Sequence, residues 1–107
     1  MSAAIRQFDV CPNPELETRE SYPYVIVLQS DALRHFASRV VAPLVAPRKI
    51  LFLERLLPEV IVKNTRYVIA MPELGIVPVT ELTTAVVNLE SQRDRIIAAL
   101  DLLFTGI

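Results

Sequence analysis

Eight prolines and only two glycines punctuate this chain of 107 residues, and this pattern constrains the fold more than any other feature. Most of the prolines bound or interrupt short apolar runs. Proline has no backbone N–H and cannot continue a helix, so it is found at strand ends, edges and bulges rather than inside long helices. The pattern therefore predicts a chain made mainly of short β-strands.

The apolar runs between the prolines give the expected positions of these strands. Residues 5–10 alternate between apolar and polar side chains, which predicts a half-buried strand. Residues 22–29 are rich in β-branched and aromatic side chains, which predicts a central strand. We expect a third strand at residues 39–45, and Pro43 within it favours an edge or a bulge.

Turn-forming residues divide the middle of the chain. Asn64 and Thr65 separate two apolar runs within residues 59–71. This predicts a hairpin, because asparagine tolerates the positive φ that a tight turn demands. The remaining expectations here are a turn at residues 74–75, a strand at 76–79, and either a short helix or a strand at 48–57.

The last segment has the period of a helix rather than that of a strand. Apolar residues recur at helical spacing from residue 96 to residue 104. Ser91 and Asp94 resemble a capping box at its start. Gly106 stands where a left-handed residue ends many helices, which would let Ile107 pack back on the last turn. The residues alone thus predict an antiparallel sheet with one C-terminal helix.

Composition limits the possible partners. The formal net charge is -1 and the isoelectric point is about 5.8, so no basic field points to nucleic acid. Charges interrupt every apolar stretch, and the first ten residues lack the apolar core of a signal peptide. We expect one domain over residues 1–107. With 52% hydrophobic residues and a mean hydropathy of +0.41, a homodimer interface is the simplest use of the excess apolar surface.

Few residues suggest chemistry. Cys11 is the only cysteine, which favours a reducing cytoplasm, and we interpret it as a buried strand residue. The only histidine, His35, excludes a site with two histidines for a metal, and we expect it to be solvated. Glu15 and Glu17 lie in a proline-bearing loop without an apolar setting that would raise a pKa. These observations favour a binding protein over an enzyme, with neither a metal nor a cofactor.

Six short segments follow one another along almost the whole chain: Gln7-Phe8, LQSD at Leu28–Asp31, RVVAPL at Arg39–Leu44, LLPEVIV at Leu56–Val62, VPV at Val77–Val79, and FTGI at Phe104–Ile107. Each segment is weak alone, and the joint match depends on their order, their spacing and the Gly-Ile ending. Together they resemble the CcdB family of toxins that poison DNA gyrase.

The resemblance implies a mainly β fold: an antiparallel, SH3-like, partly open barrel with a small extra β-sheet and one C-terminal α-helix. It also implies a non-enzymatic toxin of a type II toxin–antitoxin pair. Such a toxin binds the gyrase A subunit as a homodimer and traps the cleaved gyrase–DNA complex. A CcdA-like antitoxin with a disordered arm neutralises it. The resemblance implies that such a toxin contacts DNA only indirectly, through gyrase or through the toxin–antitoxin complex on its operator.

The resemblance also assigns contacts with gyrase. Three positions depart from the family pattern: Thr105 stands where the best-known member has tryptophan, Asp101 replaces an amide, and Ala32 replaces a bulky aliphatic residue. The apolar ending of the chain would itself belong to the contact surface. The implied gyrase contacts are Ala32, Leu33, Asp101, Phe104, Thr105, Gly106 and Ile107.

Two alternatives stay open at this point. Thr105 suggests a degenerate relative that dimerises and binds its antitoxin but does not poison gyrase. The second alternative is an endoribonuclease like MazF and Kid, which share the barrel-like fold. That chemistry needs a basic groove and an acid–base set, and the acidic isoelectric point and single histidine argue against it.

Overall fold

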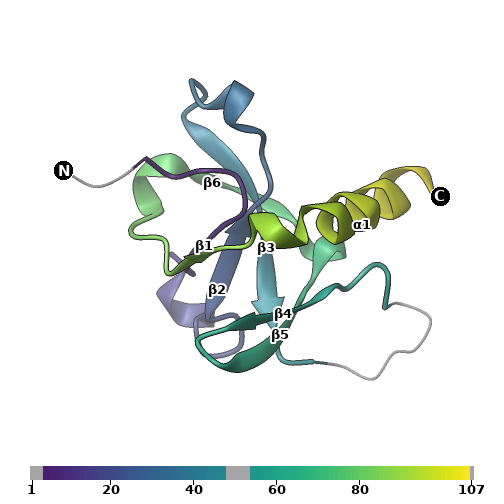
Figure 1. Ribbon diagram of the computed structural model, residues 1–107. Helices are drawn as coiled ribbons and strands as arrows, with labels where there is room; N and C mark the ends of the chain where they lie inside the picture. Colours follow the sequence, from purple (N-terminus) through teal and green to yellow (C-terminus); the bar gives the residue numbers. More distant parts are fainter. Residues whose placement is uncertain (1–3, 48–53, 107) are drawn as a thin grey trace.

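The computed structural model describes residues 4–47 and 54–106. Within these ranges, seven short strands and one α-helix follow one another, joined mostly by single 3-10 turns (Figure 1). The elements are β1 (Asp9–Pro12), η1 (Leu16–Thr18), β2 (Tyr24–Val27), η2 (Asp31–Leu33), β3 (Ser38–Val45), β4 (Glu59–Val62), β5 (Thr65–Ile69), η4 (Met71–Glu73), β6 (Gly75–Pro78), η5 (Val79–Glu81), β7 (Val87–Asn88), η6 (Glu90–Gln92) and α1 (Arg93–Thr105).

The strands form one antiparallel sheet in the order β4-β5-β3-β2-β1-β7, with β6 also paired to β3. The sheet curls into a nearly closed barrel with one C-terminal helix, which confirms the predicted fold class. The small extra β-element is the β4–β5 hairpin, which joins β3 through two residue pairs of β5. Figure 1 shows this hairpin below the barrel and α1 extending to one side.

The core lies between the sheet and α1. Phe8, Ile26 and Leu44 are fully buried there against Ile96 of the helix. A second, smaller cluster on β1, β2 and β3 includes Cys11, Val25, Val27 and Val41, covered by Leu82. The strands and the C-terminal helix thus pack together in the larger of these two clusters.

The strands predicted at residues 22–29 and 39–45 and the predicted hairpin are confirmed, and the strand predicted at residues 5–10 is displaced. β2 lies in the middle of the sheet, as expected for residues 22–29. The β4–β5 hairpin turns at Lys63 and Asn64, one residue earlier than predicted, and both have the positive φ (50° and 63°) of a type I′ turn. The strand expected at residues 5–10 begins only at Asp9, because Phe8 has a φ of 69° and lies in a turn.

The prediction that Pro43 marks an edge or a bulge is wrong. β3 is an interior strand, paired with β2 on one side and with β6 and then β5 on the other. Pro43 lies where that second side changes partner, between the pairs made by Val41 and Leu44. Its carbonyl accepts from Ala70 at 2.9 Å. The missing N–H therefore falls at a gap in the ladder and costs no strand hydrogen bond.

The predicted helix is confirmed, but its predicted capping box is wrong. α1 begins at Arg93 after a 3-10 turn, and Gln92 at its N-cap forms no side-chain capping bond. Gly106 ends the helix with a φ of 73°, and its N–H donates to the Leu102 carbonyl at 3.0 Å, as the left-handed ending predicts. The packing expected of Ile107 lies outside the described residues.

The remaining expectations concern the connections. η4 makes the turn before β6, and Gly75 is already the first residue of that strand. The strand predicted at 76–79 is therefore confirmed, one residue earlier. The helix or strand expected at residues 48–57 lies largely outside the described residues, and residues 54–57 form a turn and a bend.

Candidate partner-binding site

The first group of predicted contacts lies on a loop, residues 30–37, which we call the η2 loop. It contains Ala32 and Leu33, whose side chains are both exposed. Ser30 caps the short helix by accepting from the Ala32 N–H at 3.1 Å. The backbone N–H of Gln7 donates to Asp31 Oδ1 at 2.9 Å and ties the start of the loop to the segment before β1. The loop stands at the top of the molecule in Figure 1.

A buried arginine fixes the far end of this loop. Arg39 is only 7% exposed. Its Nη1 donates to the carbonyls of Phe36 at 2.6 Å and Ser38 at 2.9 Å, and its Nη2 donates to the carbonyl of Arg34 at 3.1 Å. All three acceptors are backbone carbonyls. These hydrogen bonds replace the water that a guanidinium would otherwise bind, and they fix the backbone from residue 34 to residue 38.

Gln29, which follows β2, fixes the same loop from its other end. Its Nε2 donates to the carbonyls of Leu33 at 3.3 Å and Ser38 at 3.2 Å, while its Oε1 accepts from the Val40 N–H at 3.1 Å. The loop is therefore held by one side chain before it and one side chain after it. A loop fixed in this way loses little conformational entropy when a partner binds.

The second group of predicted contacts lies at the end of α1, residues 101–106, which we call the α1 end. The inward face of the helix is apolar and buried through Ile96 and Ala99. Phe104 instead faces outward and is 70% exposed. Asp101, Thr105 and Gly106 are exposed as well, so the four described members of this group lie together on the surface.

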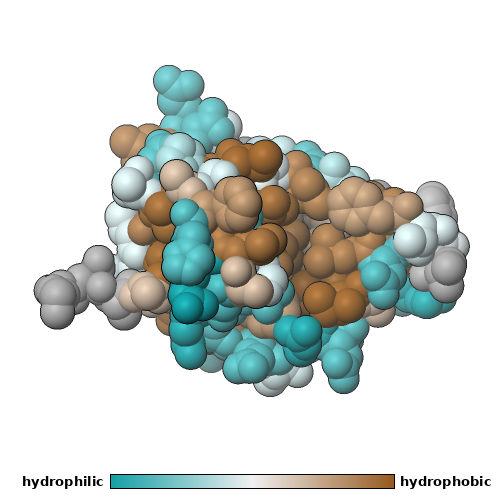
Figure 2. Space-filling view, turned by 90° about the horizontal axis from the view of Figure 1, so that it is seen from above, coloured by the Kyte–Doolittle hydropathy of each residue, from teal (hydrophilic) through white to brown (hydrophobic). Residues whose placement is uncertain are grey.

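The structure does not join the two groups within one chain. In Figure 1 the η2 loop and the C-terminus lie well apart. Figure 2 views the molecule from above, and hydrophobic side chains gather broadly over this face among fewer hydrophilic ones. Gln7 links the η2 loop to the start of α1, not to the α1 end: besides its bond to Asp31, its Oε1 accepts from Arg93 Nη1 at 3.4 Å. Arg93 also lies over the ring of Phe8, 5.5 Å from its centroid.

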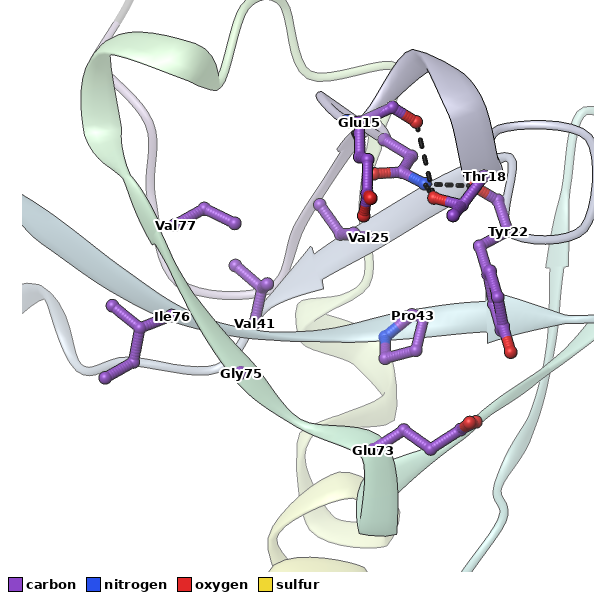
Figure 3. A pocket seen from close by; sticks show the side chains of 11 residues that line it. Glu15, Thr18, Tyr22, Val25, Val41, Pro43, Glu73, Gly75, Ile76 and Val77 are labelled. Carbon is purple, nitrogen blue, oxygen red and sulfur yellow. Dashed lines mark hydrogen bonds between the residues drawn. The ribbon is translucent and has the colours of Figure 1, made fainter.

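A pocket of about 310 Å³ opens on another side, between β6 and the η1 turn. Figure 3 shows Val25, Val41 and Pro43 on its floor. Its ionisable lining groups are two carboxylates, Glu15 and Glu73, together with a tyrosine. The lining is Asn13, Glu15, Thr18, Tyr22, Val25, Val41, Pro43, Glu73, Gly75, Ile76 and Val77 (Figure 3).

The pocket lining contains carboxylates and a tyrosine but no histidine. Asn13 uses its side-chain nitrogen within the wall, donating to Thr18 Oγ1 at 3.0 Å and to the Tyr22 carbonyl at 2.8 Å. His35, the only histidine of the sequence, is exposed on the η2 loop and does not line the pocket. Of the groups used for general acid–base chemistry, the lining residues thus supply only carboxylates and a phenol.

Cys11 is a core residue, as predicted. It is fully buried on β1. Burial, with a smaller contribution from the charge of Asp9, raises the pKa of its thiol to about 11. The thiolate needed for nucleophilic chemistry is therefore scarce at neutral pH.

Residues 4–47 and 54–106 hold no group of three or more His, Cys, Asp or Glu side chains placed to bind a metal ion. No helix within these ranges has the length and apolarity needed to cross a membrane.

A model of one protein family, described as CcdB protein, matches residues 7–106 of the chain. The chain belongs to the CcdB family. The match spans the η2 loop and all of α1, so both groups of predicted contacts lie within it except Ile107. Membership of this family supports a toxin of a CcdAB-type system. No curated protein matches the chain.

Sequence reasoning missed the residues that shape the η2 loop. Phe36 is exposed beside Leu33, and Arg39 and Gln29 fix the loop beneath them. One signal was present: Phe36 is a large apolar residue in a connection that the sequence predicts to be a turn between strands. For Arg39 the sequence offers no such signal, because an arginine at a strand start usually faces solvent.

Proposed function

We propose that this CcdB family member is a toxin that binds the gyrase A subunit as a homodimer and traps the gyrase–DNA cleavage complex. Double-strand breaks then persist. We further propose that a CcdA-like antitoxin neutralises it in the cytoplasm. The observation that carries the proposal is the α1 end, where Phe104 and Gly106 keep the residue types of the family and are exposed on a helix whose other face is buried.

Such a protein needs no covalent chemistry. A ligand shifts an equilibrium by the difference between its affinities for the two states. A toxin that binds cleaved gyrase–DNA more tightly than the religated complex therefore raises the population of breaks. Exposed apolar side chains on a fixed scaffold suit this role, because a few such residues supply most of the affinity of an interface.

Dimerisation is the second part of the proposal. The η2 loop and the α1 end lie apart within one chain (Figure 1). A dimer with a two-fold axis would carry two copies of each of these contact groups. Sedimentation equilibrium at micromolar concentration should give the mass of a dimer, and a monomer mass across that range would contradict this part.

Binding to gyrase is tested with the purified full-length protein and an immobilised gyrase A fragment. We expect measurable affinity, and we expect Phe104→Ala to weaken it about tenfold or more, as truncating an interface hot spot does. Leu16→Ala is the matched control, because Leu16 is equally exposed (72%) but lies on η1.

Two outcomes of companion experiments would replace the proposal. A folded protein that binds an antitoxin peptide but neither binds gyrase A nor arrests growth of a sensitive bacterium on induction would be the degenerate relative suggested by Thr105. Cleavage of single-stranded RNA by the purified protein, abolished by substitution of one of its own residues, would establish an endoribonuclease instead.

A further inference from the structure

Phe36 is the largest exposed side chain of the η2 loop, with 63% of its surface in solvent. Leu33, three residues earlier, is 46% exposed. The Phe36 N–H donates to the Leu33 carbonyl at 3.1 Å, so the two residues are separated by one tight turn. η2 ends at Leu33, and Phe36 lies after the turn that follows it; we call these two exposed apolar residues the strip.

The position of this strip is fixed from below. Arg39 donates to the Phe36 carbonyl itself at 2.6 Å and to the carbonyl of Arg34 on the other side of the turn. Gln29 donates to the Leu33 carbonyl at 3.3 Å. Each end of the strip thus has its own backbone carbonyl held by a side chain that lies just before or just after the loop. An exposed aromatic residue on a loop so fixed is the usual form of an interface anchor, since little entropy is lost on binding.

We infer that Phe36, with Leu33, is a second anchor for the gyrase A subunit and supplies aromatic contact area that Thr105 lacks. This inference rests on the proposed function. Ala32 and Leu33 are the loop contacts that family membership suggests, and the strip continues directly from Leu33. At the α1 end Phe104 is the single aromatic residue among the described positions, so Phe36 is the second exposed phenylalanine available to the same partner.

The surroundings of Phe36 resemble those of an anchor at a protein interface. Asp31, Arg34 and His35 are all exposed around the strip and form a polar rim. Interfaces commonly place an aromatic residue at the centre of such a rim, which excludes water from the central contact. Figure 2 shows hydrophobic side chains bordered by hydrophilic ones on the face toward which the η2 loop points.

The test compares full-length variants for binding to an immobilised gyrase A fragment. We expect Phe36→Ala to weaken binding about tenfold or more, and Phe36→Trp to retain affinity within about threefold, because aromatic area is what the contact uses. Leu16→Ala, which truncates an equally exposed apolar side chain on η1, should leave affinity unchanged. Circular dichroism and thermal melting verify that each variant is folded.

Each other result overturns the inference in a recognisable way. If the wild-type protein binds gyrase A and Phe36→Ala binds as tightly as Leu16→Ala, the inference fails and the proposed function stands. If Phe36→Ala instead lowers the mass in sedimentation equilibrium, the strip is a contact between two copies of this chain. If the wild-type protein does not bind gyrase A at all, the proposed function fails and this contact fails with it.

Discussion

The hydroxyl of Thr105 donates to the backbone carbonyl of Asp101 at 2.6 Å, one helical turn back. A threonine that bonds in this way satisfies a carbonyl near the end of a helix and keeps its own proton within the chain. Thr105 therefore offers gyrase no hydrogen-bond proton while that bond is kept. The bond uses the backbone of Asp101, so the Asp101 carboxylate is left as an exposed charge at the α1 end.

Replacing that charge should help both stability and binding. We expect Asp101→Asn to stabilise the protein by about 0.3–1 kcal/mol, because a negative charge near a helix C-terminus opposes the helix dipole. The same variant should bind gyrase A at least as tightly as the wild type, since an amide also donates and needs no desolvation of a charge. Chemical denaturation and calorimetry measure the two effects.

Asp94→Asn is the matched control for this prediction. Asp94 lies in the first turn of the same helix, where a negative charge is favourable. The control should therefore lower stability slightly and leave the affinity for gyrase A unchanged. A clear loss of affinity in Asp101→Asn would mean that the carboxylate itself contacts the partner.

Deleting Gly106 and Ile107 should abolish toxicity and leave the fold largely intact. Gly106 contributes one capping bond to the Leu102 carbonyl, and losing a helix cap of this kind costs about 1 kcal/mol. If these residues contact gyrase, growth arrest should disappear although circular dichroism shows a folded protein. A truncated, well-folded protein that still arrests growth at wild-type expression would show that the ending is only a cap.

Removing Arg39 should release the η2 loop. Arg39→Ala leaves the carbonyls of Arg34 and Phe36 without their donor, which we expect to cost about 1–3 kcal/mol of unfolding free energy. The Phe36 amide, bonded to Leu33 within the loop, should exchange its hydrogen faster, and gyrase affinity should fall even where the protein is folded.

Arg34→Ala provides the comparison for that variant. Arg34 is exposed, and its Nη1 makes one hydrogen bond of 3.3 Å, to the Asp31 carbonyl. Hydrogen exchange of the loop should therefore change little. Equal exchange rates in the Arg39 and Arg34 variants would contradict the view that the buried guanidinium holds the loop.

Burial of Cys11 predicts a loss of stability at alkaline pH. Its pKa is raised from 9.0 to about 11 in the folded protein, so between these values the folded thiol keeps its proton and the unfolded thiol has lost it. The unfolded state then binds fewer protons, and the free energy of unfolding falls as pH rises through this window. Denaturation of Cys11→Ala over the same pH range should show a shallower decline, and equal slopes would contradict the shifted pKa.

The fold was predictable in segments where the spacing of apolar side chains determines the secondary structure. The alternating and apolar runs predicted β2 and the β4–β5 hairpin, and the helical period predicted α1 with its ending at Gly106. These features depend on local pattern, which a sequence carries directly. The predicted contact residues at the α1 end likewise lie exposed, as a surface role requires.

Features that depend on distant partners were not predictable. Phe8 keeps a positive φ because buried Asp9 accepts from the Arg6 N–H at 2.8 Å and from Asn88, which lies 79 residues away, at 2.9 Å. Pro43 is tolerated in an interior strand because β3 changes from pairing with β6 to pairing with β5 around that residue. The capping box predicted at Ser91 does not form, because Ser91 lies within the 3-10 turn that precedes α1.

The central claim, that this toxin traps cleaved gyrase–DNA, is tested most directly by a cleavage assay with purified protein. Supercoiled plasmid is incubated with gyrase, ATP and either the wild-type protein or the variant lacking Gly106 and Ile107. We predict that linear plasmid accumulates with the wild-type protein and not with the variant. No linear plasmid above the gyrase-only control, from a folded protein that binds gyrase A, would contradict the claim.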